Sequence, residues 1–167
     1  QAIVITPDAA FGRAVAAAVE ARLETLPRRA IAAASWAQNG AVIVVRDLDE
    51  AAALSNRVAP EHLEILTANP EALAAKCTHA GAIFLGAFTP EAIGDYVGGP
   101  NHVLPTARSA RFSSGLNVLD FMKRTTIARM TPEALKAIGP AAERLAASEG
   151  LQAHGLSVRA RLDRLNG

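Results

Sequence analysis

Short apolar runs rich in β-branched residues alternate with helix-forming segments along the first half of this 167-residue chain. The runs cover residues 2–6, 41–45, 63–66 and 82–85. Runs of this kind are typical of buried strands. Because strands that alternate with helices form parallel sheets, we expect an α/β fold of the open type. Binding sites in such folds lie at the carboxyl ends of the strands, and we expect the site there.

The segments between and after these runs have helical patterns. We expect helices over residues 9–26, 28–38, from 47 onward and over 69–79, the last of which places His79 in its final turn. After residue 106 we expect a short apolar element within 116–123, a brief strand at 125–128 and helices from Thr131 onward. Breaks at Gly139-Pro140 and near Gly150 should divide this last part into two or three helices.

The composition argues against several classes of function. Half of the residues are apolar but only 4% are aromatic, so we expect a core of Ala, Val, Leu and Ile. With 17 basic and 16 acidic side chains the net charge is +1, which indicates neither a nucleic-acid partner nor an anionic membrane. The single Cys77, expected to be a small buried residue, fits a reducing compartment. No apolar run approaches the ~20 residues of a membrane span, so we expect a cytoplasmic protein.

Three separated segments carry ionisable side chains that could form one polar site. They are the Glu61-His62 pair, Asp95 with His102, and Glu149 with His154. The segment 94–106, which contains Asp95 and His102, is rich in glycine and proline and is too stiff for a long regular element. A loop of this kind holds side chains in fixed positions, as a binding or catalytic loop must.

The Glu61-His62 pair has two interpretations. One is a pair of solvated side chains that follow a proline. The other is a pair of bases, since an imidazole with an ordinary pKa of ~6.5 can take a proton at neutral pH and a carboxylate can deprotonate a water. Adjacent residues of an extended segment point to opposite faces, so Glu61 and His62 would approach a substrate from different directions.

The other two groups indicate metal or ligand binding only weakly. Asp95 and His102 are also common turn and loop residues, and two ligands do not complete a zinc site. Glu149 and His154 are five residues apart around the expected break at Gly150, so they would not share one face of a straight helix.

Several segments closely resemble the histidinol dehydrogenase family, in the family's order. They are residues 56–64 (NRVAPEHLE), 80–86 (AGAIFLG), 94–96 (GDY), 99–106 (GPNHVLPT), 110–116 (ARFSSGL) and 120–124 (DFMKR), continuing to Glu149 and His154. The resemblance implies an enzyme that oxidises L-histidinol to L-histidine through L-histidinaldehyde with two NAD, the final steps of histidine biosynthesis. It also implies one zinc ion per site and a homodimer, in which the C-terminal helical segment completes the partner's site.

The same resemblance implies a role for each polar residue. His62 would be the base for the alcohol step, and Glu61 would activate water for the second oxidation. The zinc ligands would be Asp95 and His154, and the substrate would contact His62, Asp95, His102, Glu149 and His154.

The family's other two zinc ligands, a Gln and a His, and its NAD-binding domain have no counterpart in this chain, so we expect it to be the C-terminal portion of such an enzyme. Residues 1–115 would be the second half of an incomplete Rossmann-like α/β unit, and residues 116–167 a helical dimerisation segment. We expect the chain to be inactive without the missing N-terminal portion. The alternatives are a non-catalytic dimerisation or assembly fragment of the same family and, last, a generic zinc hydrolase, for which no HExxH-like spacing exists.

Overall fold

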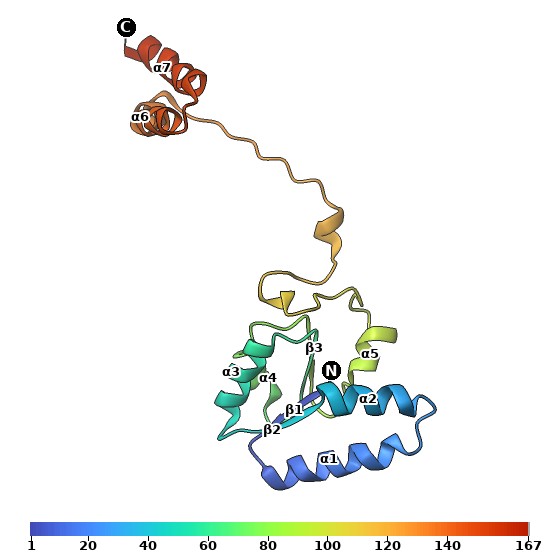
Figure 1. Cartoon of the computed structure of the whole chain (residues 1–167). Coiled ribbons are helices and arrows are strands. Elements are labelled where there is room, and N and C mark those ends of the chain that lie inside the picture. The colour runs from blue at the N-terminus through green and yellow to red at the C-terminus, as the bar shows by residue number, and fades with distance from the viewer. Residues whose placement is uncertain (167) are drawn as a thin grey trace. The chain divides into compact units, whose positions relative to one another are not determined.

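The computed structural model describes residues 1–166, which fall into two compact units (Figure 1). The first unit ends at Phe121 and the second begins at Met122. None of the helices in residues 1–166 combines the length and the apolar character that crossing a membrane requires.

The first unit is a mixed α/β structure with parallel strands. Its elements are β1 (Ile3–Thr6), α1 (Ala9–Leu23), α2 (Arg29–Asn39), β2 (Ala41–Val44), α3 (Leu48–Val58), β3 (His62–Ile65), α4 (Pro70–Ala74), β4 (Ala82–Leu85) and α5 (Glu91–Tyr96), followed by the 3₁₀ turns η1 (Ser109–Arg111) and η2 (Val118–Phe121). Strand β1 pairs with β2, and β3 pairs with β4, in both cases in parallel. The predicted α/β class is therefore confirmed, with two small sheets among the described residues.

A small aliphatic core supports the β3–β4 sheet. Ile65 and Ala52 are buried there together with Cys77, which is 8% exposed, and Leu63 and Leu85 pack against them. The prediction that Cys77 is a small buried residue is confirmed. Burial also raises the pKa of its thiol, as expected for a group removed from water.

Helix α3 leads directly into the Glu61-His62 pair. The Asp47 side chain caps its first turn by accepting from the N–H of Glu50 at 2.8 Å. At the other end, Ala59 has φ +50° and ends the helix in the left-handed conformation. Pro60 follows, so the chain leaves the helix at once and enters β3 at His62.

Helix α4 ends at Ala74, so the predicted helix to residue 79 is too long and His79 is not in a helical turn. The physical reason is the side chain of Asn56 on α3. Its amide donates to the carbonyl of Lys76 at 2.8 Å, and its oxygen accepts from the N–H groups of Thr78 and His79. These bonds hold the segment after α4 in an irregular conformation against α3.

The second unit is a helical hairpin of α6 (Pro132–Ser148) and α7 (Gln152–Asn166). Thr131, from which helices were predicted, caps α6, and Gly150, at φ +70°, makes the predicted break between the helices. The predicted strand at 125–128 is wrong, because these residues form no regular element. The predicted break at Gly139-Pro140 is also wrong, because α6 continues through both residues.

Close packing against α7 accounts for the continuity of α6 at Gly139. A Cβ atom at this position would lie 3.1 Å from Leu162 Cδ1 and 3.2 Å from Val158 Cγ1. Gly139 is thus a contact point between the two helices, and this contact offsets the hydrogen bond that Pro140 cannot make.

Substituting valine for Gly139 should therefore destabilise the hairpin by about 1–3 kcal/mol, the usual cost of overpacking a close contact. Gly155→Val is the matched control, because a Cβ there meets its nearest neighbour, Ala146 Cβ, at an ordinary 3.6 Å. Urea unfolding followed by circular dichroism measures both variants. Equal midpoints for the two would contradict the packing role of Gly139.

Candidate functional site

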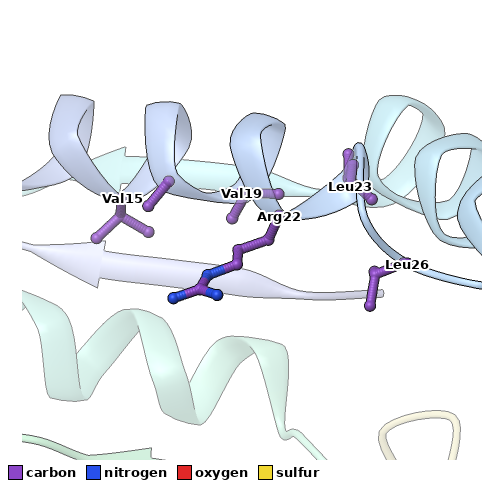
Figure 2. Close-up of a pocket in the computed structure, with 6 residues that line it drawn as sticks. Val15, Val19, Arg22, Leu23 and Leu26 are labelled. Atoms are coloured by element: carbon purple, nitrogen blue, oxygen red, sulfur yellow. The ribbon is translucent and has the colours of Figure 1, made fainter.

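Two hollows of the first unit are each lined by only one ionisable side chain. One, of about 300 Å³, lies along α1 and is lined by Val15, Ala18, Val19, Arg22, Leu23 and Leu26 (Figure 2). Arg22 is its one ionisable side chain, and no acid or base accompanies it. The second hollow, near α4, likewise contains no His, Asp or Glu among its lining residues. The candidate site is instead the cluster of ionisable side chains between β3 and α5.

One face of the β3–β4 sheet forms the floor of this cluster. His62 is in register with Ala82, and Glu64 with Phe84, and residues two apart on a strand share a face. The rings of His62 and Phe84 have centroids 5.9 Å apart and are tilted by 39°. Phe84, which is 7% exposed, therefore supports one side of the imidazole.

Helix α5 lies against this face at very short range. A Cβ atom at Gly94 would lie 2.4 Å from Phe84 Cε1, so only glycine allows the helix to come this close. Glu91 and Asp95, four residues apart, share one face of α5. The helix therefore carries two carboxylates to the imidazole of His62.

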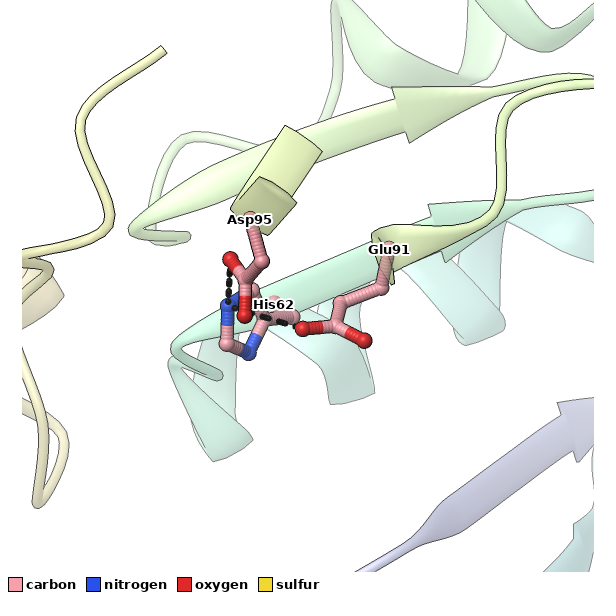
Figure 3. A group of neighbouring side chains, drawn as sticks. All are labelled: His62, Glu91 and Asp95. Atoms are coloured by element: carbon pink, nitrogen blue, oxygen red, sulfur yellow. Dashed lines mark ion pairs between the residues drawn. The ribbon is translucent and has the colours of Figure 1, made fainter. Parts of the chain in front are cut away.

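The resulting cluster joins residues from three places in the sequence. His62 Nε2 lies 3.4 Å from Asp95 Oδ1 and 3.7 Å from Glu91 Oε1 (Figure 3). His102 Nδ1 lies 2.9 Å from Asp95 Oδ2. The Asp95 side chain is only 11% exposed, whereas the His102 side chain is 64% exposed. Asp95 is thus the central group, with an imidazole on each of its oxygens.

The two carboxyl groups of α5 influence each other's protonation. The hydrogen bond with Asp95 raises the pKa of the Glu91 carboxyl, and burial raises it further. The hydrogen bond from Glu91, and after it the one from His102, lower the pKa of Asp95. Two carboxyl groups this close resist ionising together, so Asp95 is the one that ionises more readily.

The cluster has the donors of a divalent metal site. One ligand atom each from His62, Glu91 and Asp95 lies within 4.8 Å of the others. His62 Nε2 is buried and has no hydrogen-bond partner among the described residues, although buried polar atoms are usually satisfied. Imidazole nitrogen and carboxylate oxygen are ligands that zinc accepts. These three side chains therefore supply only part of the ligand set of a zinc ion, which takes four ligands.

Glu61 is held through its backbone. Its carbonyl accepts from the N–H of Ala82 at 2.9 Å, and the carbonyl of Pro60 accepts from the N–H of Gly81 at 3.0 Å. A Cβ atom at Gly81 would lie 2.6 Å from the Glu61 carbonyl oxygen, so no other residue fits at position 81 without displacing Glu61. The half-buried Glu61 is not one of the three clustered ligands, and its predicted role as water activator stays a prediction.

Glu149 and His154 belong to the second unit, and both are exposed. Glu149 follows α6, where its N–H donates to the carbonyl of Leu145 at 3.0 Å. His154 lies near the start of α7. Their predicted contacts with substrate and metal therefore stay predictions.

The predicted place of the site is wrong in one respect. His62 is the first residue of β3, so the cluster forms at the amino end of this strand and not at the carboxyl end. The reason is α5, which leaves the carboxyl end of β4 and brings its carboxylates back along the sheet. The same helix brings in Glu91, which lies upstream of the predicted loop at 94–106 and is not among the predicted site residues. The four-residue spacing of Glu91 and Asp95 after Pro90 was the available signal.

Adding a methyl group at Gly94 should force α5 away from the sheet. We expect Gly94→Ala to destabilise the first unit by about 1–3 kcal/mol, because the new Cβ overlaps the Phe84 ring. A second variant, Phe84→Leu, removes the ring edge and should make Gly94→Ala less costly in the double variant. Urea midpoints of the four proteins give the coupling energy, and additive effects would contradict direct contact at this point.

The comparisons with known proteins agree on one family. A family model described as histidinol dehydrogenase matches residues 1–162. The histidinol dehydrogenase of Cereibacter sphaeroides is 80% identical over 166 residues, which cover 99% of this chain and 38% of that protein. That of Ruegeria pomeroyi is 78% identical over 167 residues, or 39% of its length. The crystal structure of histidinol dehydrogenase from Elizabethkingia anophelis superposes with a TM-score of 0.81 at 39% identity, over 99% of this chain and 38% of that one. The chain thus spans less than two-fifths of the length of the curated relatives it matches.

Proposed function

Because this chain belongs to the histidinol dehydrogenase family, we propose that it supplies the base and part of the metal site of an enzyme that oxidises L-histidinol to L-histidine. The observation that carries the proposal is the convergence of His62, Asp95 and His102 on one point. Each of these residues lies in a segment by which the chain resembles the family. An assembly fragment would need none of these side chains, which weighs against the non-catalytic alternative.

In the proposed first oxidation, His62 takes the proton of the substrate hydroxyl while the carbinol carbon loses a hydride, which leaves an aldehyde. In the second, Glu61 takes a proton from the water that adds to this aldehyde, and the hydrate loses a second hydride to become the carboxylic acid. Base catalysis of this kind contributes typically ~10²–10⁴-fold. When bound, NAD supplies the acceptor for each hydride.

Asp95 is the metal ligand that this unit contributes, and His154 is the second ligand that the chain contributes. A mostly buried carboxylate with an imidazole beside it supports this role for Asp95. The remaining ligands and the NAD site are assigned to the portion of the relatives that this chain does not cover. When bound, zinc would serve as a Lewis acid that orients the substrate's nitrogen atoms, since it has no redox chemistry of its own.

The proposed enzyme is a cytoplasmic homodimer. Residues 116–167 form the dimerisation segment, and Glu149 and His154 complete the site of the partner subunit. His102 and Glu149 contact the substrate. The exposure of Glu149 and His154 on the helical hairpin supports this arrangement, because both are accessible to a second copy.

A chimera tests the proposal. The chain is joined to the remaining portion of the Cereibacter sphaeroides relative, which is 80% identical over the shared part. We expect the chimera to reduce two NAD per histidinol in the presence of zinc, and the chain alone to be inactive. Robust turnover by the chain alone would contradict the need for the second portion. A chimera that forms dimers and binds zinc but does not oxidise histidinol would favour the assembly alternative.

A further inference from the structure

Helix α5 begins without a cap of its own. Pro90 precedes it and makes no side-chain hydrogen bond to the first turn. The first N–H groups of a helix need an acceptor from elsewhere. Here the N–H of Glu91 donates to Oε1 of Glu64 on β3 at 2.8 Å, within the range of a good hydrogen bond. A residue 27 positions earlier in the sequence thus caps α5.

The Glu64–Glu91 contact lies on the same faces of β3 and α5 as the cluster of His62 and Asp95. Glu64 and His62 are two residues apart on the same face of β3, and Glu91 and Asp95 are four apart on the same face of α5. Glu64 meets the backbone of Glu91, while His62 meets the side chain of Asp95. Together with the close approach of Gly94 to Phe84, these two contacts along the helix place α5 on the strand.

The contacts of the Glu64 side chain are concentrated at this helix end. A carboxylate that accepts from the first N–H of a helix makes a charge-assisted hydrogen bond at the positive end of the helix dipole. Glu64 is exposed, and its hydrogen bond to Glu91 is the one side-chain bond recorded for it among the described residues. An exposed residue whose one side-chain hydrogen bond is to the start of α5 indicates a role in placing that helix.

We propose that Glu64 is a positioning residue, which caps α5 from β3 and so holds Asp95 at the distance from His62 and from the metal that the reaction requires. The inference rests on the proposed function for the roles of His62 and Asp95. Losing a group that orients a metal ligand typically costs 10–100-fold in metal affinity or activity. Displacing a catalytic group by about 1 Å can cost ~10²-fold in rate.

The test uses the chimera described above with three substitutions. Glu64→Ala removes the acceptor, Glu64→Gln keeps a carbonyl oxygen at the same place, and Glu71→Ala is the matched control. Glu71 is exposed, as Glu64 is, and lies in the first turn of the short helix α4. Zinc affinity is measured by competition with a chelator, and kcat and KM by NAD reduction.

We expect Glu64→Ala to weaken zinc affinity and lower kcat by about 10–100-fold, and Glu64→Gln and Glu71→Ala to remain close to the parent. The rescue by glutamine separates positioning from a need for charge. Wild-type values for Glu64→Ala, or equal losses for alanine and glutamine, would overturn the inference. If the parent binds zinc but does not oxidise histidinol, the proposed function fails while the zinc affinities still decide the role of Glu64.

A second measurement needs neither zinc nor turnover. Amide hydrogen exchange of Glu91, measured by NMR on the 167-residue chain, reports the hydrogen bond itself. Its protection should be lost in Glu64→Ala and kept in Glu64→Gln. Equal protection in the two variants would rule out Glu64 as the cap of α5.

Discussion

Replacing His62 by asparagine in the chimera should slow oxidation of the alcohol by ~10²–10⁴-fold, the usual contribution of a positioned base. Asparagine keeps a polar side chain of similar reach but cannot take the hydroxyl proton. Oxidation of added aldehyde should suffer much less, because its water is activated by Glu61. The Phe84 ring and α5 still enclose the position, so the fold should survive the change.

Each half-reaction is measured separately, with L-histidinol and with L-histidinaldehyde as the starting substrate. His79→Asn is the matched control, since His79 contacts Asn56 and not the cluster. Zinc content is determined in parallel, because His62 lies 3.4 Å from Asp95. Equal losses in both half-reactions at full zinc content would remove the assignment of His62 to the alcohol step.

The strands could be predicted from the sequence because their signal is local. The run at 82–85 coincides with β4, and the others differ from the observed strands by at most a few terminal residues. The end of α4 could not be predicted in this way. It depends on Asn56, which lies on another helix and meets Lys76 and Thr78 only in the folded chain. The continuity of α6 through Gly139-Pro140 likewise depends on α7.

The same distinction applies to the candidate site. His62, Asp95 and His102 could be singled out because each is an ionisable residue in a stiff segment, and the structure brings them together. Glu64 carries no such local signal, and Glu91 has only its four-residue spacing from Asp95 after Pro90. Their importance comes from the docking of α5 on the sheet, which requires Gly94 and Phe84 to meet across the fold. Residues that act by positioning others are therefore the ones that sequence patterns miss.

Replacing Glu61 by glutamine should have the opposite effect to His62→Asn and stop the reaction between its two oxidations. Glutamine has the same shape and leaves the Gly81 and Ala82 contacts of the backbone intact. It cannot take a proton from water, so oxidation of the aldehyde should slow by ~10²–10⁴-fold. Oxidation of the alcohol should continue, because His62 and Asp95 are unchanged.

The expected signature is a change in stoichiometry. The parent reduces two NAD per histidinol, whereas Glu61→Gln should reduce one in the first turnovers and accumulate the aldehyde, which is detected with a carbonyl reagent. Glu71→Gln, an exposed change of the same type on α4, is the control and should keep the stoichiometry of two. A variant that loses both oxidations equally would mean that Glu61 acts on the substrate before the aldehyde forms. The adjacent pair would then work as one unit and not as two bases for two steps.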